Sequence, residues 1–203
     1  MRRIVLPVAV IASLALTSPA GAGEPTAQVR AVIDQVLAIQ NDPALQGPQH
    51  EDRRAVDIKR VIAQSFNFNA MARQSLGREW DRLSPPQRQE FTEVLQDLFQ
   101  DSYGKLVLGF LKRETIRYGA ERGEGEGATV KTVIERLARE QIPVDYRLWR
   151  SGGKWDIVDV VIDGVSIVET YRSQFIKIIR SASYDALLRK MKAKREEIPP
   201  AQR

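Results

Sequence analysis

Three acidic residues, Asp156, Asp159 and Asp163, have the side chains and the spacing that acid–base chemistry would require. They lie along one predicted strand and its exit, where two carboxylates could pair to transfer a proton. No nucleophile or base accompanies them, so we interpret them as part of a solvent-facing surface and a turn. The sequence therefore predicts no catalytic residue.

His50 is the only histidine of the chain. It precedes the charged run Glu51–Arg54 at the start of a predicted helix, a position typical of an exposed first-turn residue rather than of a general base or a ligand. The chain has no cysteine, so it lacks the ligands that zinc and copper sites need, and it must be stable without disulfides. We expect no metal ion and no cofactor.

Two further patterns concern phosphates and charged surfaces. Gly123, Gly125 and Gly127 alternate with glutamates, which would repel a phosphate, and no Lys-Ser or Lys-Thr pair follows as a P-loop requires. We therefore predict a flexible hairpin loop over Glu121–Gly127. The basic run Arg189–Arg195 has two interpretations: a contact with anionic head groups or an acidic partner, or the solvated end of a helix, where the helix dipole favours cations.

The N-terminal segment differs in composition from the rest of the chain. Arg2 and Arg3 precede the apolar run Ile4–Leu16, and small residues follow up to Ala22. This order is typical of a secretory signal peptide, and the run is shorter than the roughly 20 residues that cross a bilayer. We predict cleavage after Ala22 and a periplasmic mature protein, because extracellular proteins more often carry disulfides.

Charge and length limit what the mature chain can be. Without Arg2 and Arg3, the 31 basic residues fall to 29 against 26 acidic ones, an excess too small to indicate nucleic-acid binding. The remaining length suits one domain with a substantial core. We predict a signal peptide over residues 1–22, one lipid-binding α+β domain over residues 23–191, and a charged tail over residues 192–203 that frays.

The period of the hydrophobic pattern predicts helices first, strands next and helices last. A capping sequence, Ser84–Gln87, opens the longest helix, which runs for about seven turns to Phe110. The other predicted helices cover Thr26 to Asn41, Ala55 to Phe66, Ala70 to Leu76, Thr170 to Arg180 and Tyr184 to Met191.

Between the long helix and the two closing helices, the hydrophobic period changes to two. Four strands are predicted there: Thr115–Ala120, Thr129–Leu137, one that Pro143 opens, and Trp155–Ile162. The last strand alternates irregularly, and a β-bulge near Asp159 would return its apolar residues to one face. Consecutive hairpins form an antiparallel sheet, and helices gathered on one face of it make an α+β fold that tends to enclose a cavity.

Several motifs follow one another along the mature chain. In the helical half they are Phe66–Gly77, Trp80, Ser84–Gln87 and Tyr103-Gly104. In the second half they are Tyr146-x-Leu148, Gly153-Lys154-Trp155, Asp159-Val160, Asp163–Val168 and Tyr171-Arg172-x-x-Phe175. Their order resembles the MlaC-type periplasmic phospholipid carriers, a family with toluene-tolerance and hopanoid-associated members, over nearly the whole mature chain.

This resemblance implies an NTF2-like α+β fold, in which a curved antiparallel sheet of about four strands is wrapped by N- and C-terminal helices around an apolar cavity. It implies a carrier that holds the acyl chains of a phospholipid or a hopanoid-like lipid. The carrier would shuttle between an outer-membrane lipoprotein complex and an inner-membrane ABC transporter with an MCE-type lipid-binding subunit. The resemblance brings no catalytic residue, and we expect a monomer that binds no nucleic acid.

Such a cargo requires a deep, dry pocket. A buried methylene is worth about 0.8 kcal/mol, so two chains of about 16 carbons represent on the order of 25 kcal/mol. We expect the pocket between the sheet and the long helix, with its mouth near Gly164–Ile167 and Phe66–Gly77. Each apolar residue there could also be an ordinary core residue. The predicted lipid contacts are Leu76, Trp80, Phe99, Tyr103, Phe110, Tyr146, Leu148, Trp155, Val160, Ile162, Val165, Ile167 and Phe175.

Two other functions stay open at this point. An NTF2-like fold can host an enzyme of the ketosteroid-isomerase type, which needs a carboxylate or a Tyr-Asp pair deep in the cavity. An apolar groove can also bind a partner helix, as in an adaptor protein that holds no lipid. Turnover of steroid-like or polyketide-like substrates would favour the enzyme, and bound lipid would exclude the adaptor.

Overall fold

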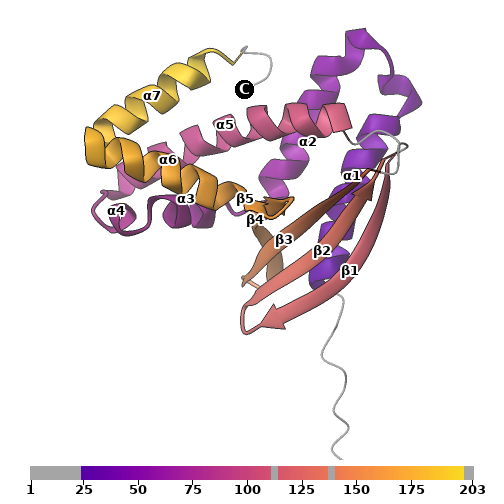
Figure 1. Ribbon diagram of the computed structural model, residues 1–203. Coiled ribbons are helices and arrows are strands. Elements are labelled where there is room, and N and C mark those ends of the chain that lie inside the picture. The colour runs from indigo at the N-terminus through magenta and orange to yellow at the C-terminus, as the bar shows by residue number, and fades with distance from the viewer. Residues whose placement is uncertain (1–23, 111–113, 137–139, 199–203) are drawn as a thin grey trace, which may run out of the picture.

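The computed structural model describes residues 24–110, 114–136 and 140–198, and the backbone alone at 105, 106, 108–110 and 124. The predicted signal peptide, residues 1–22, lies outside the described residues. Helices come first, strands next and helices last, as the sequence predicts (Figure 1). The elements are α1 (Glu24–Asn41), the short 3-10 helices η1 (Pro43–Leu45) and η2 (Pro48–His50), α2 (Glu51–Ser65), α3 (Phe68–Leu76), α4 (Arg78–Asp81), α5 (Pro85–Phe110), β1 (Thr115–Glu124), β2 (Gly127–Glu135), β3 (Gln141–Ser151), β4 (Lys154–Ile162), β5 (Val165–Ser166), α6 (Ile167–Ser181) and α7 (Tyr184–Glu196).

The long helix α5 forms where the sequence predicts it. A capping box starts it: Ser84 N donates to Gln87 Oε1 at 2.9 Å, and Gln87 N donates to Ser84 Oγ at 3.5 Å. One stripe of the helix, which includes Phe91, Leu95 and Phe99, is buried. The helix therefore forms the spine of the helical layer, and α2, α3 and α7 pack against it.

The strands form one antiparallel sheet in the order β1-β2-β3-β4-β5. Two of its hairpins turn on residue pairs with positive φ, Gly152-Gly153 and Asp163-Gly164, as type I′ turns require. The sheet has the four predicted strands and a fifth, β5, which is only two residues long. The α+β fold with a curved antiparallel sheet and flanking helices is thus confirmed (Figure 1).

The predicted loop over Glu121–Gly127 is wrong. β1 continues to Glu124 and β2 starts at Gly127, with Arg122 opposite Thr129 in the ladder. Backbone hydrogen bonds sustain this pairing without apolar side chains, so a polar, glycine-rich composition did not end the strands.

The bulge predicted near Asp159 is present. Arg147 lies opposite Asp159, whereas the next residue of β3, Leu148, lies opposite Ile157, so Val158 is the extra residue of β4. As a result Ile157 and Val160 are both buried in the hydrophobic core.

The helical layer contacts the sheet at several places, two of which lie on the face that α1 covers. α1 packs against β1, β2 and β4, and the link between α2 and α3 crosses the start of β4, where Asn67 N donates to the carbonyl oxygen of Ile157 at 2.8 Å. These contacts fix α1, α2 and α5 over one face of the sheet. α3, α6 and α7 pack on one another beyond the β4 edge.

The C-terminal segment is more ordered than predicted. α7 runs to Glu196 instead of Met191, and Ile198 is buried in the core. Arg195 in the last turn pairs with Asp97 of α5 at 2.6 Å. The expectation that the tail frays from Lys192 is therefore wrong as far as Ile198, and residues 199–203 lie outside the described residues.

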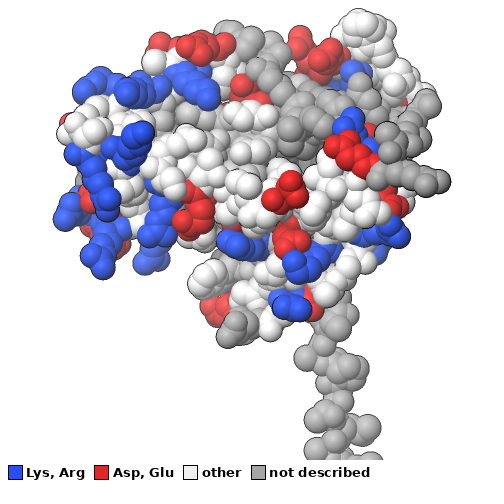
Figure 2. All heavy atoms as spheres, in the orientation of Figure 1, with Lys and Arg blue, Asp and Glu red and all other residues white. Residues whose placement is uncertain are grey.

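Charge is distributed unevenly over the surface. Figure 2 shows Lys and Arg side chains gathered over the end of the molecule that α6 and α7 form. Among them are the exposed Lys177, Arg180, Arg189 and Lys190. A search of the described helices finds none with the length and apolarity needed to cross a membrane.

Candidate functional site

An apolar cavity lies between the inner face of the sheet and α1, α2 and α5, with a free volume of about 120 Å³. Its lining comes from both layers of the fold, since the helices and the sheet each contribute several side chains. The lining residues are Val32, Ile33, Val36, Ile62, Phe66, Phe99, Tyr103, Val107, Ile134, Val144, Tyr146, Val160, Ile162 and Ile167.

Strand register explains the sheet side of this cavity. Val144 pairs with Ile162 and Tyr146 pairs with Val160, so all four side chains leave the same face in two adjacent rows. The bulge at Val158 lets Ile157, before it, and Val160, after it, face the same side of the sheet. Without the extra residue, one of these two side chains would point to the opposite face.

Aromatic packing forms the wall on the α2 and α5 side. The Phe66 ring lies 5.3 Å from Phe99 and 6.0 Å from Phe68, and Phe99 lies 4.6 Å from Tyr103, measured between ring centroids. Rings at these separations pack well in offset or tilted arrangements. Phe66 sits at the end of α2, at the point where the chain is bonded to β4, so the wall is tied to the sheet.

Among the described residues, the lining contains no acidic or basic side chain, and its polar side-chain atoms are the hydroxyls of Tyr103 and Tyr146. Burial raises the pKa of Tyr146, and the neighbouring Tyr118 adds to this. Burial also raises the pKa of Tyr103, with a contribution from the charge of Asp159. Both groups therefore stay protonated near neutral pH. No cluster of metal-ligating side chains occurs among residues 24–110, 114–136 and 140–198.

The size of the cavity limits the size of the molecule that it can hold. A dry apolar cavity of about 150 Å³ accommodates a molecule such as benzene. The space of about 120 Å³ is therefore the size of one small ring or a short piece of hydrocarbon. A lipid with two long chains fits only if the sheet and the helices separate.

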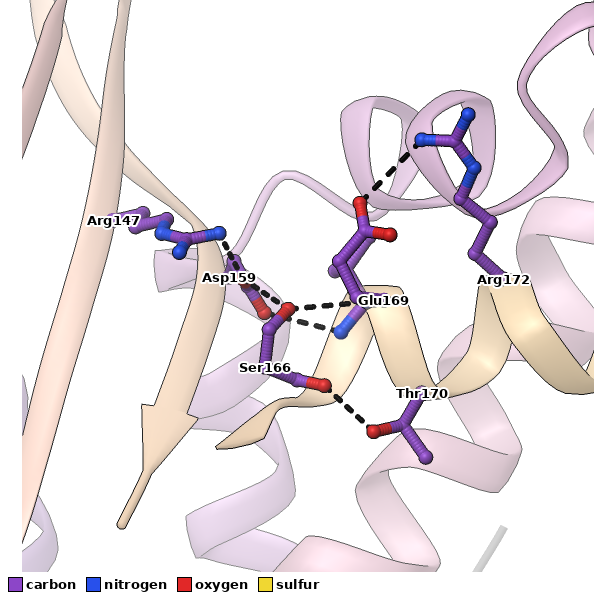
Figure 3. A network of polar contacts seen from close by, with 7 residues as sticks. Arg147, Asp159, Ser166, Glu169, Thr170 and Arg172 are labelled. Atoms are coloured by element: carbon purple, nitrogen blue, oxygen red, sulfur yellow. Dashed lines mark hydrogen bonds and ion pairs between the residues drawn. The ribbon is translucent and has the colours of Figure 1, made fainter. Parts of the chain in front are cut away.

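Asp159 does not line a solvent-facing surface, contrary to the sequence interpretation, because its side chain is 2% exposed. Figure 3 shows how it is held. Its carboxylate accepts hydrogen bonds from Arg147 Nη1 at 3.0 Å, Ser166 Oγ at 2.6 Å and the backbone N–H of Val168 at 3.1 Å. Asp156, on the same strand, is also buried. The donors occupy the Asp159 oxygens, so its role here is to hold the start of α6.

Ser166 completes this arrangement at the N-cap of α6. Its Oγ accepts from Glu169 N at 3.1 Å, while Thr170 Oγ1 donates to the Ser166 carbonyl oxygen at 2.7 Å (Figure 3). Because Ile167 follows directly, the network places that side chain at the cavity.

The structure brings together six of the thirteen residues predicted as lipid contacts, and six others lie elsewhere. The Phe110 side chain lies outside the described residues. Four of the six are buried in the core without lining the cavity: Leu76, Leu148, Phe175 and Trp80, the last of which lies under the Arg88 side chain. Trp155 is half-buried, and its Nε1 donates to Glu24 Oε2 at 3.3 Å. Val165 is 61% exposed. Those that line the cavity are Phe99, Tyr103, Tyr146, Val160, Ile162 and Ile167.

Seven lining residues were not predicted from the sequence, and an eighth, Phe66, was expected only as part of the mouth segment Phe66–Gly77. Their apolar character and helical or strand spacing were visible, but spacing shows only that a residue is buried and does not show against which neighbour. Of the two segments expected at the mouth, only Phe66 and Ile167 line the cavity. The seven are Val32, Ile33, Val36, Ile62, Val107, Ile134 and Val144.

The sequence matches the protein family described as MlaC protein over residues 30–193. The toluene tolerance protein ttg2D of Pseudomonas putida is 23% identical over 119 residues, which are 58% of this chain and 55% of that protein. The intermembrane phospholipid transport system binding protein MlaC of Haemophilus influenzae is 22% identical over 139 residues, 66% of this chain and 64% of that protein. The chain thus spans less than two thirds of the length of either of these relatives.

A similar solved structure is that of the phospholipid-binding protein from Ralstonia solanacearum in complex with a phospholipid. It superposes with a TM-score of 0.75 at 23% identity and covers 86% of this chain and 98% of that one. At this level of identity, the likeness establishes the fold.

Proposed function

The chain belongs to the MlaC protein family, and from this premise we propose that it is a carrier that holds the acyl chains of a phospholipid in the cavity between its sheet and its helices. The observation that carries the proposal is the cavity wall, in which twelve of the fourteen described side chains are purely hydrocarbon and none of the fourteen is ionisable at neutral pH. The proposed contacts are these lining residues, with Tyr103 and Tyr146 as the two polar ones.

Loading must widen the cavity. Two chains of about 16 carbons would cost on the order of 25 kcal/mol if left in water during transfer, so the widened cavity has to enclose them. Lipid enters as the sheet moves away from α1, α2 and α5.

We place this activity in the periplasm, after cleavage of the signal peptide behind Ala22. The carrier, a monomer, moves lipid between an outer-membrane lipoprotein complex and an inner-membrane ABC transporter with an MCE-type subunit. The names of the relatives support this, since one is called an intermembrane phospholipid transport system binding protein. The composition of residues 1–22 supports export.

The cavity does not favour the two other functions. An isomerase-type enzyme needs an acid in the cavity. The carboxylate whose charge helps to raise the pKa of Tyr103, that of Asp159, is buried and accepts hydrogen bonds from three donors. A helix-binding adaptor needs an open apolar groove, and the apolar surface here faces an interior hollow. We therefore propose neither catalysis nor a cofactor.

The test is to identify what the protein carries. Protein purified from its own host, from the periplasmic fraction, is measured by native mass spectrometry and then extracted with organic solvent for lipid analysis. We expect one lipid with two acyl chains per protein, and a hopanoid-like lipid in its place would change the cargo but not the function. Protein recovered from the host without any lipid would contradict the proposal.

A further inference from the structure

Two tyrosine side chains leave the inner face of the sheet close to each other. Tyr118 of β1 pairs with Thr132 of β2, while Tyr146 of β3 pairs with Val130, two residues away on the same strand. Residues two apart on a strand point to the same face, so both rings rise toward the helices in adjacent rows. Tyr146 lines the cavity, and Tyr118 packs against the core beside it.

The Tyr118 hydroxyl is buried and has no hydrogen-bond partner among the described residues. Its ring cannot easily turn away, because the Arg30 guanidinium of α1 lies over it, 3.9 Å from the ring centroid. Buried polar groups without a partner are rare in folded proteins, and a ligand is one of the reasons for their presence.

Tyr146 lines the cavity itself, and its hydroxyl is not one of the fully buried unpartnered atoms of the described residues. It donates to no described residue, and burial raises its pKa, so it remains a hydrogen-bond donor at any physiological pH. A third inward polar residue, Thr132, differs because its Oγ1 donates to the Val144 carbonyl oxygen at 2.8 Å. Within the sheet, the Thr132 hydroxyl therefore has an acceptor, whereas the hydroxyls of Tyr118 and Tyr146 have none beside an otherwise hydrocarbon wall.

A diacyl lipid supplies the matching acceptors. Its ester carbonyl oxygens are the polar atoms nearest to the hydrocarbon chains, and they accept hydrogen bonds without donating any. When the chains enter an apolar cavity, these oxygens leave water and need a donor. A lipid with ether-linked chains has the same hydrocarbon but no such carbonyl.

We propose that Tyr146, with Tyr118 behind it, donates a hydrogen bond to an ester carbonyl oxygen of the bound glycerolipid, so that the cavity selects ester-linked over ether-linked chains. This inference rests on the proposed carrier function and adds a polar criterion to it. The Tyr146 hydroxyl then has an acceptor in an ester lipid and lacks one in an ether lipid.

The test compares two probes that differ only in this group: dipalmitoyl phosphatidylethanolamine and its dihexadecyl ether counterpart. Delipidated full-length mature protein is titrated with each, and the ratio of the two Kd values is measured. We expect the wild-type protein to prefer the ester lipid by roughly tenfold, the effect of one hydrogen bond in a dry site. Tyr146→Phe should bring the ratio close to one, and Tyr118→Phe should lower it partway.

The controls separate this inference from the function itself. Tyr184→Phe removes a hydroxyl that donates to the Gln87 carbonyl oxygen at 3.3 Å, away from the cavity, and should leave the ratio unchanged. A circular dichroism spectrum that matches the wild type shows that each variant is folded. Equal binding of both lipids by the wild-type protein, or a preference kept by Tyr146→Phe, overturns the inference and leaves the carrier function standing. A loss of preference in Tyr103→Phe alone would move the contact to α5 and also overturn it. If neither lipid binds, the proposed function itself fails.

Discussion

Ser166 Oγ donates a 2.6 Å hydrogen bond to Asp159 Oδ2 and so joins the bulged strand β4 to the first turn of α6. The two residues belong to two of the motifs that carry the family resemblance, Asp159-Val160 and Asp163–Val168. Their bond holds three cavity residues in place: Val160 and Ile162 on the strand and Ile167 on the helix. The motif is thus a structural joint beside the cavity.

Replacing the acid of this joint should destabilise the fold. In Asp159→Asn one carboxylate oxygen becomes an amide that cannot accept from Ser166 or Arg147, so the free energy of unfolding should fall by about 1–3 kcal/mol. Urea denaturation measures the change. Asp163→Asn is the matched control, since Asp163 is exposed and asparagine tolerates its φ of 49°. Equal stabilities of the two variants would show that the network contributes nothing.

Filling the cavity should separate lipid retention from stability. Val160→Phe adds a ring next to the empty space and should reduce the lipid recovered with the protein, while the free energy of unfolding stays the same or rises by up to about 1 kcal/mol. Val165→Phe makes the same change at a side chain that is 61% exposed and should retain lipid normally. Lipid extraction and denaturant unfolding give the two readouts. Full retention in Val160→Phe would mean that lipid binds elsewhere.

Two glycines of the helical half should respond in opposite directions to alanine. Gly77, between α3 and α4, has φ 54° and ψ −127°, a conformation open to glycine, so Gly77→Ala should cost about 1–3 kcal/mol. Gly104 lies within α5, and an added Cβ would meet only the Lys59 side chain at 3.9 Å. Gly104→Ala should therefore stabilise by about 0.5–1 kcal/mol. Thermal unfolding monitored by circular dichroism tests both signs, and the same sign for both would contradict the backbone explanation.

Alkaline pH should unfold the protein through its tyrosines. All five have a raised pKa, for Tyr184 about 12, chiefly because burial disfavours the phenolate. The unfolded chain loses these protons near pH 10, while the folded protein keeps them. Above that pH the unfolded state binds fewer protons, so the free energy of unfolding falls as the pH rises toward 12.

Phenolate absorbance and circular dichroism, followed together from about pH 9 to about pH 12, check this. We expect the two signals to change in one transition. Tyr146→Phe should make the decline of stability with pH less steep, because one of the most deeply buried phenols is removed. Ionisation of all five tyrosines near pH 10 in a protein that stays folded would refute the prediction.

The sequence predicts the order of elements, the long helix and the bulge of β4, because each of these depends on local signals. Ser84 and Gln87 cap α5 directly, and the change of phase between Ile157 and Val160 requires an extra residue wherever both are buried. The position of the hairpin turn at Gly125 could not be predicted in the same way, because the backbone pairing of β1 and β2 continues through charged residues that are typical of loops.

The site was predictable only in part, because lining a cavity depends on which surfaces meet. Leu148 shares the strand face of Val144 and Tyr146, yet it is buried outside the cavity. The apolar stripe of α1 predicts a buried face but does not show that this face looks onto the sheet. The burial of Asp159 depends on donors from Arg147, Ser166 and Val168, which come together only in the folded chain.

The sheet has a consequence for the order in which the chain folds. Its strands pair with sequence neighbours through short hairpins, so each can zip up soon after it leaves the ribosome. The first helix, α1, packs on its sequence neighbour α2, but its contacts with the sheet reach far along the chain, since Thr26 N bonds to Glu121, 95 residues further on. The side of α1 that faces the sheet therefore stays uncovered until the strands have been made, and until then its apolar stripe is available to chaperones.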